Sequence, residues 1–133
     1  MIVGEAATAH PDGTISILRA WINQFFGQAP PFPFRGAIIA RIEAEIGDSG
    51  SHRFDLRCLN EDGGDVLPKL EGTFEVPPGG GSIAFVLNPQ VQFAKTGKFL
   101  FVLRIDQVQL AEWPIRVAQI QPGAHPPQAH PSA

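Results

Sequence analysis

Apolar and polar residues alternate with a period of two along most of this chain, and turn-forming residues separate the alternating runs. In residues 53–59 the side chains of Phe54, Leu56 and Cys58 fall on one face, and charged side chains fall on the other. A period of two places successive side chains on opposite faces of a β-strand. Each run therefore predicts a strand with one face in a core, and the chain as a whole predicts an all-β fold.

Eight runs of this kind follow one another at the spacing that is typical of a two-layered β-fold. They span residues 2–9, 14–22, 38–46, 53–59, 66–76, 82–91, 98–106 and 108–117. We expect an antiparallel β-sandwich of the immunoglobulin-like or Greek-key type, formed by one domain over residues 1–118. Residues 119–133 contain Pro, Ala, Gln and His without periodicity, and we expect a flexible proline-rich C-terminal tail there.

The charges predict how two of these strands pair. Residues 47–50 suit a tight hairpin between the runs 38–46 and 53–59. Pairing Ile42 with Phe54 would place an acidic side chain opposite a basic one at both neighbouring positions, which favours this register. These pairs are Glu43 with Arg53, and Arg41 with Asp55.

Two strands also change the parity of their apolar positions, which predicts irregular pairing. The change between Ile17 and Leu18 predicts a bulge near these residues. In the last run, Pro114 cannot donate to a ladder, so we expect a bulge or an edge position at 112–114.

Several classes of protein are excluded by composition. A net charge of −3 with 10 lysines and arginines argues against nucleic-acid binding through phosphate neutralisation. The one cysteine excludes a disulfide framework. No segment approaches the roughly 18 apolar residues of a membrane helix, and the first residues lack the features of a signal peptide. We therefore expect a cytoplasmic protein that contacts neither nucleic acid nor membrane.

No set of residues in the chain has the spacing of a catalytic, metal or cofactor site. The carboxylates of Glu43 and Glu45 share a face with arginines, as on an ordinary solvated strand. The thiol of Cys58 points inward, which predicts a small buried side chain with a raised pKa. The histidines match no recognised ligand pattern; they are His10, His52, His125 and His130. We expect no enzyme activity, no metal and no cofactor.

Aromatic residues and prolines gather in the connection that follows the second run. Its aromatic residues are Trp21, Phe25, Phe26, Phe32 and Phe34, and its prolines are Pro30, Pro31 and Pro33. Two interpretations remain open: the loop folds back and closes one end of the core, or it exposes an apolar patch for a partner. Trp113, on an expected edge strand, is a second candidate contact.

These features favour a non-catalytic interaction or assembly module, which binds itself or another protein. Two routes are available, namely β-strand addition at an exposed edge and docking through the proline- and phenylalanine-rich loop. The alternative is a β-sandwich that binds a small ligand of carbohydrate type. The chain has 10 Phe, 2 Trp and no Tyr, and this composition favours the first hypothesis because sugar sites use aromatic rings with polar edges.

Several short stretches resemble a bacterial family of small uncharacterised β-sandwich domains of unknown function. They include Gly-Glu-Ala-Ala at 4–7, Asp-Gly-Thr-Ile-Ser-Ile-Leu at 12–18, Trp-Ile-Asn-Gln-Phe at 21–25, Glu-Asp-Gly at 61–63, Thr-Gly-Lys-Phe at 96–99 and Ile-Arg-Val at 115–117. The resemblance covers about residues 1–118 and implies a fold without an activity. The chain departs from the family pattern at Arg19, where Gly is commoner, and at Asp106-Gln107, where Asp-Gly is usual.

Overall fold

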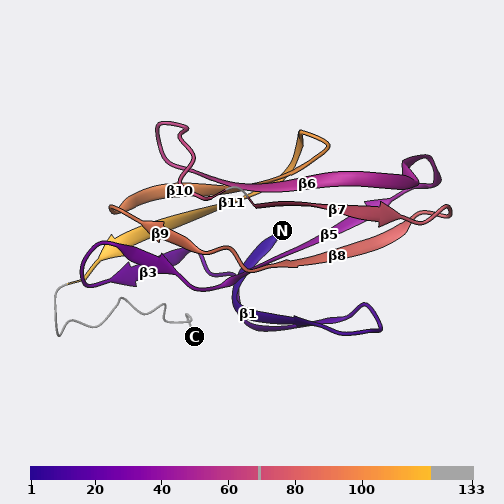
Figure 1. Cartoon of the computed structure of the whole chain (residues 1–133). Helices are drawn as coiled ribbons and strands as arrows, with labels where there is room; N and C mark the ends of the chain where they lie inside the picture. The colour runs from indigo at the N-terminus through magenta and orange to yellow at the C-terminus, as the bar shows by residue number, and fades with distance from the viewer. Residues whose placement is uncertain (69, 121–133) are drawn as a thin grey trace, which may run out of the picture.

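The computed structural model describes residues 1–68 and 70–120, and almost all regular structure within them is β-strand (Figure 1). The strands are β1 (Ile2–Ala9), β2 (Ile15–Ala20), β3 (Gln24–Gly27), β4 (Phe32–Phe34), β5 (Ala37–Ala44), β6 (Gly50–Leu59), β7 (Leu70–Val76), β8 (Gly81–Leu87), β9 (Val91–Phe93), β10 (Gly97–Ile105) and β11 (Val108–Gln119). The prediction of an all-β fold is confirmed. No helix within the described residues has the length and apolar character needed to cross a membrane.

The strands form two large sheets and one small sheet. The four-stranded sheet has the order β2-β1-β5-β8, the five-stranded sheet has the order β3-β11-β10-β6-β7, and β4 pairs with β9. Paired strands are antiparallel, except that β3 runs parallel to β11. Figure 1 shows β6, β10 and β11 in one layer and β5 and β8 in the other.

The main core lies between the two large sheets. Val3 and Ile38 from the four-stranded sheet belong to the same buried cluster as Leu56, Cys58 and Phe101 from the five-stranded sheet. Leu56 and Cys58 stand on the face that the period of two directs inward, so the predicted inner face of β6 is confirmed for these two residues. Burial of these apolar faces is the main stabilising term of the fold.

The small sheet adds aromatic side chains to this core. In its register Phe32 lies opposite Phe93, and Phe34 lies opposite Val91. All four side chains are buried in the main cluster, and the ring of Phe34 contacts the ring of Phe101 at a centroid distance of 5.2 Å. The short strands β3, β4 and β9 escape sequence-based prediction because each has four residues or fewer and prolines interrupt their surroundings.

The predicted hairpin between β5 and β6 is wrong. Strand β5 pairs with β1 and β8, whereas β6 pairs with β10 and β7, so Ile42 lies opposite Ile83 and Phe54 lies opposite Ile105 and Gly72. The connection contains one turn of 3-10 helix, η1 (Ile46–Asp48), and carries the chain from one sheet to the other. Ile46, the last residue of the predicted run 38–46, lies in this turn and is 71% exposed.

The predicted positions of irregular pairing need correction as well. The register of β1 and β2 runs without a shift through Ile17 and Leu18, so no bulge lies there. In the pairing of β10 with β11 the register shifts at Leu110, before the predicted segment 112–114. Pro114 keeps the expected edge position, because β3 pairs only with residues 116–119 in the part of the chain that is described.

Left-handed backbone occurs at the two places where the chain departs from the family pattern. Arg19 has φ +51°, and the two residues of the β10–β11 turn, Asp106 and Gln107, have φ +50° and +69°. Two successive positive φ values define the hairpin turn that favours Asp-Gly, which explains the usual sequence there. At the end of β11, Gln119 lies in the strand and the Ile120 amide donates to the Gly27 carbonyl, so the predicted tail begins too early. Its remaining residues, 121–133, lie outside the described part.

Candidate functional site

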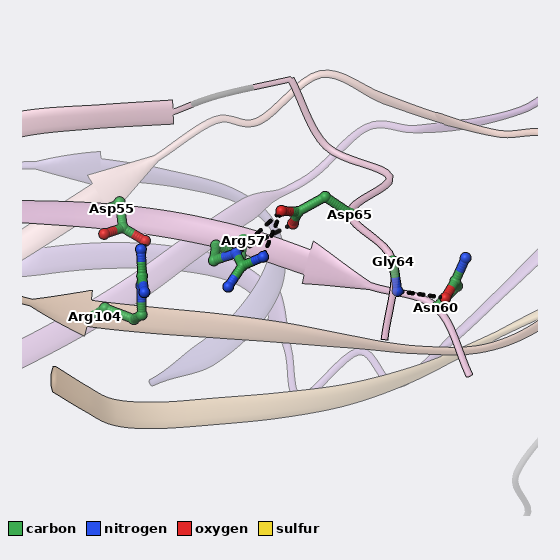
Figure 2. Close-up of polar contacts among 6 residues, drawn as sticks. All are labelled: Asp55, Arg57, Asn60, Gly64, Asp65 and Arg104. Atoms are coloured by element: carbon green, nitrogen blue, oxygen red, sulfur yellow. Dashed lines mark hydrogen bonds and ion pairs between the residues drawn. The ribbon is translucent and has the colours of Figure 1, made fainter. Parts of the chain in front are cut away.

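The outer face of β6 and β10 carries the charges that the alternation predicted. Arg57 pairs with Asp65 at 2.6 Å and Arg104 pairs with Asp55 at 2.8 Å (Figure 2). A hollow of about 780 Å³ lies over this face. Because both guanidinium groups already contact a carboxylate of the same chain, the hollow is not a ready-made site for an anion. The pairs instead support the interpretation of a solvated face.

The loop that carries Asp65 is held by an asparagine. Asn60 Oδ1 accepts a hydrogen bond from the backbone amide of Gly64 at 2.8 Å (Figure 2). It also accepts one from the backbone amide of Asp62 at 3.0 Å. Asp65 also forms an isolated bridge with Leu59 at the end of β6. These bonds place the carboxylate beside Arg57 without help from a ligand.

His52 connects the chain crossover to the β10–β11 turn. Its Nδ1 lies 2.6 Å from Asp106 Oδ2, and its Nε2 lies 2.5 Å from the Asp48 carbonyl. Both partners are acceptors, so the ring satisfies both contacts only as the doubly protonated imidazolium. The hydrogen bond that the His52 ring donates to Asp106 raises the pKa of His52. The hydrogen bonds that Asp106 accepts lower its own pKa, first the one from the backbone amide of Arg53 and then the one from His52. The arrangement is a structural clamp, because no nucleophile adjoins it among these partners.

The one cysteine lies inside the core. Cys58 is fully buried, and burial raises the pKa of its thiol to about 12. A thiol with this pKa is protonated at neutral pH and has little nucleophilic character. The predicted buried cysteine with a raised pKa is confirmed.

The aromatic loop divides into buried and exposed parts. Phe32 and Phe34, expected as possible contact residues, are 4% and 3% exposed in the core, so the partner-surface interpretation is wrong for these two. Phe25 is half-buried, with its ring edge-on to Phe34 at 4.9 Å, and Phe26 is half-buried on the same short strand. The phenylalanines therefore help to close the core, as the other interpretation expected. Their burial follows from β4 pairing with β9, which no local pattern indicates.

Trp21 differs from these phenylalanines and forms a pair with Trp113. The two indole rings lie 5.5 Å apart at an angle of 32°, and Trp21 is 68% exposed. The Trp113 indole N–H donates to the Ile22 carbonyl at 2.7 Å, which fixes the orientation of that ring. The two tryptophans are candidate contact residues from distant segments, and the structure brings them together. Sequence reasoning named both but carried no signal that they are neighbours.

The backbone that presents Trp21 is unusual. Trp21 has φ +67° and Arg19 has φ +51°, and a bulky side chain rarely adopts this left-handed region. Such backbone costs of the order of 1–3 kcal/mol and is found most often at functional sites. An exposed aromatic ring on left-handed backbone therefore marks residues 19–22 as a candidate contact segment.

A second candidate surface is the β1–β2 arm, which we define as residues 5–20. From Ile2 to Gly4, β1 pairs with β5, but beyond Gly4 it pairs only with β2 within the described residues. Figure 1 shows this hairpin apart from the two layers. On β2, Leu18 is 58% exposed and Ile17 is 37% exposed. The sequence predicted both strands of the arm but not their departure from the sheet.

Gly4 allows the arm to fold back at its base. A Cβ atom at this position would lie 2.9 Å from the Cγ2 atom of Ile17, which is closer than real contacts allow. At the tip, Asp12 accepts hydrogen bonds from the backbone amide and the hydroxyl of Thr14 at 3.0 and 2.6 Å. The arm is therefore shaped at both ends by its own residues.

Comparisons with known proteins give a family but no activity. Residues 1–118 match a family of unknown function, DUF6941. No curated protein and no solved structure matches the chain.

Proposed function

The chain belongs to the DUF6941 family of unknown function, and from its surface we propose that it is a non-catalytic assembly module. Its edge strand β2 pairs with β2 of a second copy. The observation that carries this proposal is the β1–β2 arm, where exposed apolar side chains stand on a strand with one free edge.

A free edge of this kind favours addition of another strand. Two-stranded ribbons are at best marginally stable in water, and unpaired edge amides and carbonyls form a template for pairing. Burying a leucine side chain such as that of Leu18 contributes about 1.5–3 kcal/mol relative to full exposure. Strand addition at β2 would supply both kinds of stabilisation.

The charges of β2 are compatible with self-pairing. Antiparallel pairing about an axis between Ile17 and Leu18 places Arg19 opposite Ser16 of the second copy. Arg19 is the one charged residue in β2, so this register brings no like charges together. All six residues of β2 would find a partner.

Two other edges of the large sheets, β7 and β8, are less suitable. Strand β7 carries Glu71 and Glu75, which would repel a second copy of the same strand. Strand β8 has no charge, but its large apolar side chains, such as Phe85, are already buried or half-buried. Pairing there would gain less apolar burial than pairing at β2.

We also propose that the two large sheets form an immunoglobulin-like sandwich. In that fold one sheet contains strands A, B and E and the other contains C, F and G. The order β1-β5-β8 matches A-B-E, and the order β6-β10-β11 matches C-F-G, which supports the proposal. An experimental structure with the same order would confirm this assignment, and another order would overturn it.

The assembly is tested by sizing the full chain over a range of concentrations. We expect a dimer. We expect Leu18→Lys to convert it to a monomer, because the variant places a charged lysine of each copy opposite Ile17 of the other copy. Leu110→Lys is the matched control, because Leu110 is 56% exposed on β11, outside the arm. A wild-type chain that stays monomeric at every concentration, or a Leu110→Lys variant that dissociates equally, would overturn the proposal.

A further inference from the structure

We propose that the Trp21–Trp113 pair is a docking surface for a proline-rich segment in extended conformation. Its occupant is the C-terminal segment of the same chain, residues 121–133. This inference does not rest on assembly through β2, because it concerns a different surface and a different occupant.

The surface has the chemistry that proline-rich segments require. Such segments dock on exposed aromatic rings, which contact the proline rings, and on donors that reach their free carbonyls. Trp21 offers an exposed ring at 68% exposure, tilted by 32° against the ring of Trp113. Trp113 uses its indole N–H on the Ile22 carbonyl, whereas the Trp21 indole makes no hydrogen bond within the described residues. Trp21 therefore supplies both the face and the donor.

The cost of the Trp21 backbone points to the same conclusion. A large apolar ring loses stabilisation when it is exposed, and left-handed backbone at a tryptophan adds a further cost. Trp21 combines an exposed ring with left-handed backbone, and each of these lowers the stability of the fold. An occupant that covers the ring would offset the first of them.

The composition of residues 121–133 fits this surface. The segment Gln-Pro-Gly-Ala-His-Pro-Pro-Gln-Ala-His-Pro-Ser-Ala has four prolines and no Asp, Glu, Lys or Arg. Proline fixes φ near the value of the polyproline II helix, which lowers the ordering cost of binding. The segment therefore matches an aromatic surface better than a charged one.

The segment is also long enough to reach the surface. Ile120 lies at the end of β11, seven residues after Trp113, and this distance is about 23 Å along a strand. Pro122-Gly123 is a dipeptide typical of a chain reversal. Residues 124–133 then span about 31 Å in polyproline II conformation, which exceeds the distance back to the pair.

Tryptophan fluorescence tests this proposal directly, because the chain has two tryptophans and no tyrosine. In the full chain, we compare wild type with the triple variant Pro126→Ala, Pro127→Ala, Pro131→Ala, because Pro131 is the proline that the segment's reach brings to the pair. We expect the variant to show emission at longer wavelength and stronger quenching by acrylamide, since its tryptophans lose their cover. A synthetic peptide of residues 121–133, added to the variant, is expected to reverse both changes.

The matched control is the double variant Pro77→Ala, Pro78→Ala, which changes an exposed diproline in the turn after β7. We expect this control to leave emission and quenching at wild-type values. Equal quenching of wild type and the triple variant would overturn the proposal. Quenching that falls with protein concentration would also overturn it, because the segment would then dock on a second copy. A response to simple sugars in the peptide's place would show a carbohydrate surface and contradict it.

Discussion

Phe34 and Trp21 lie in one short aromatic segment, yet Phe34 is buried and Trp21 is exposed. Phe34 is 3% exposed and contacts rings from β3 and β10, whereas Trp21 is 68% exposed and contacts one ring of β11. Both residues are large and apolar, and both lie in the connection that follows β2. The difference shows that hydrophobicity alone does not decide burial. The strand that each residue joins decides it, since β4 enters the core and residue 21 precedes β3 at the sheet edge.

The largest expected effect comes from truncating the two rings. Phe34→Ala should lower the free energy of unfolding by about 3–5 kcal/mol, because it leaves a cavity in the main core. Trp21→Ala should change it by about 1 kcal/mol or less, because most of the ring is in water. Urea unfolding of the full chain measures both. Should Phe34→Ala fail to fold, Phe34→Leu provides the smaller cavity, and equal losses at the two positions would contradict the comparison.

Removing one hydrogen bond sharpens the role of the second tryptophan. Trp113→Phe keeps an aromatic ring but deletes the donor to the Ile22 carbonyl. We expect a loss of about 0.5–1.5 kcal/mol in unfolding free energy, as for a typical internal hydrogen bond. Trp21→Phe is the control, since the indole of Trp21 donates no bond within the described residues. A smaller loss at Trp113 than at Trp21 would show that this bond does not orient the pair.

A smaller effect is expected from relieving the left-handed backbone. It tests whether a positive φ at a non-glycine residue lowers the stability of this fold. Gln107→Gly should raise the unfolding free energy by about 1 kcal/mol or less, because glycine adopts φ +69° without steric cost. Gln92→Gly, in the middle of β9, should have the opposite sign, since glycine weakens a strand. Thermal or urea unfolding distinguishes the two. A stabilisation at both positions would remove the argument from backbone conformation, including the one made for Trp21.

The smallest expected effect is the pH dependence of the stability that the His52 clamp contributes. The pKa of His52 is raised in the folded state by its bond to Asp106, so the clamp stabilises the fold fully below the unfolded pKa near 6.5. This contribution is lost as pH rises through the higher folded pKa. We expect the stability difference between wild type and His52→Gln to shrink over that range. A difference that grows with rising pH would contradict the clamp.

The sequence predicts the eight principal strands because each combines a period of two with turn residues at its ends. It does not predict their partners, as the hairpin between β5 and β6 shows. The pairs Glu43 with Arg53 and Arg41 with Asp55 were electrostatically reasonable, but Arg41 pairs with Glu43 of its own strand at 2.9 Å. Asp55 instead forms an ion pair with Arg104, which lies on β10, far away in the sequence. Surface charges contribute too little to choose between sheets.

For the candidate site too, the sequence indicated the residues but not the contacts between them. Composition indicated that Trp21 and Trp113 were unusual, and the proline-rich segment was visible at once. Their contact was not visible, because the two tryptophans meet through parallel pairing of β3 with β11. The β1–β2 arm was hidden for a related reason: the alternation of β1 continues unchanged after Gly4, where its pairing with β5 ends.

By itself, the sequence determined which side of a strand such as β6 faces the core, because side chains alternate about any extended backbone. It also determined the buried, unreactive state of Cys58 and the places of the turns. The tertiary structure decided which strands pair, which end of the aromatic segment is buried, and where β1 leaves its sheet. These choices depend on backbone hydrogen bonds, which every strand can offer equally, and on apolar contacts between segments far apart in the chain.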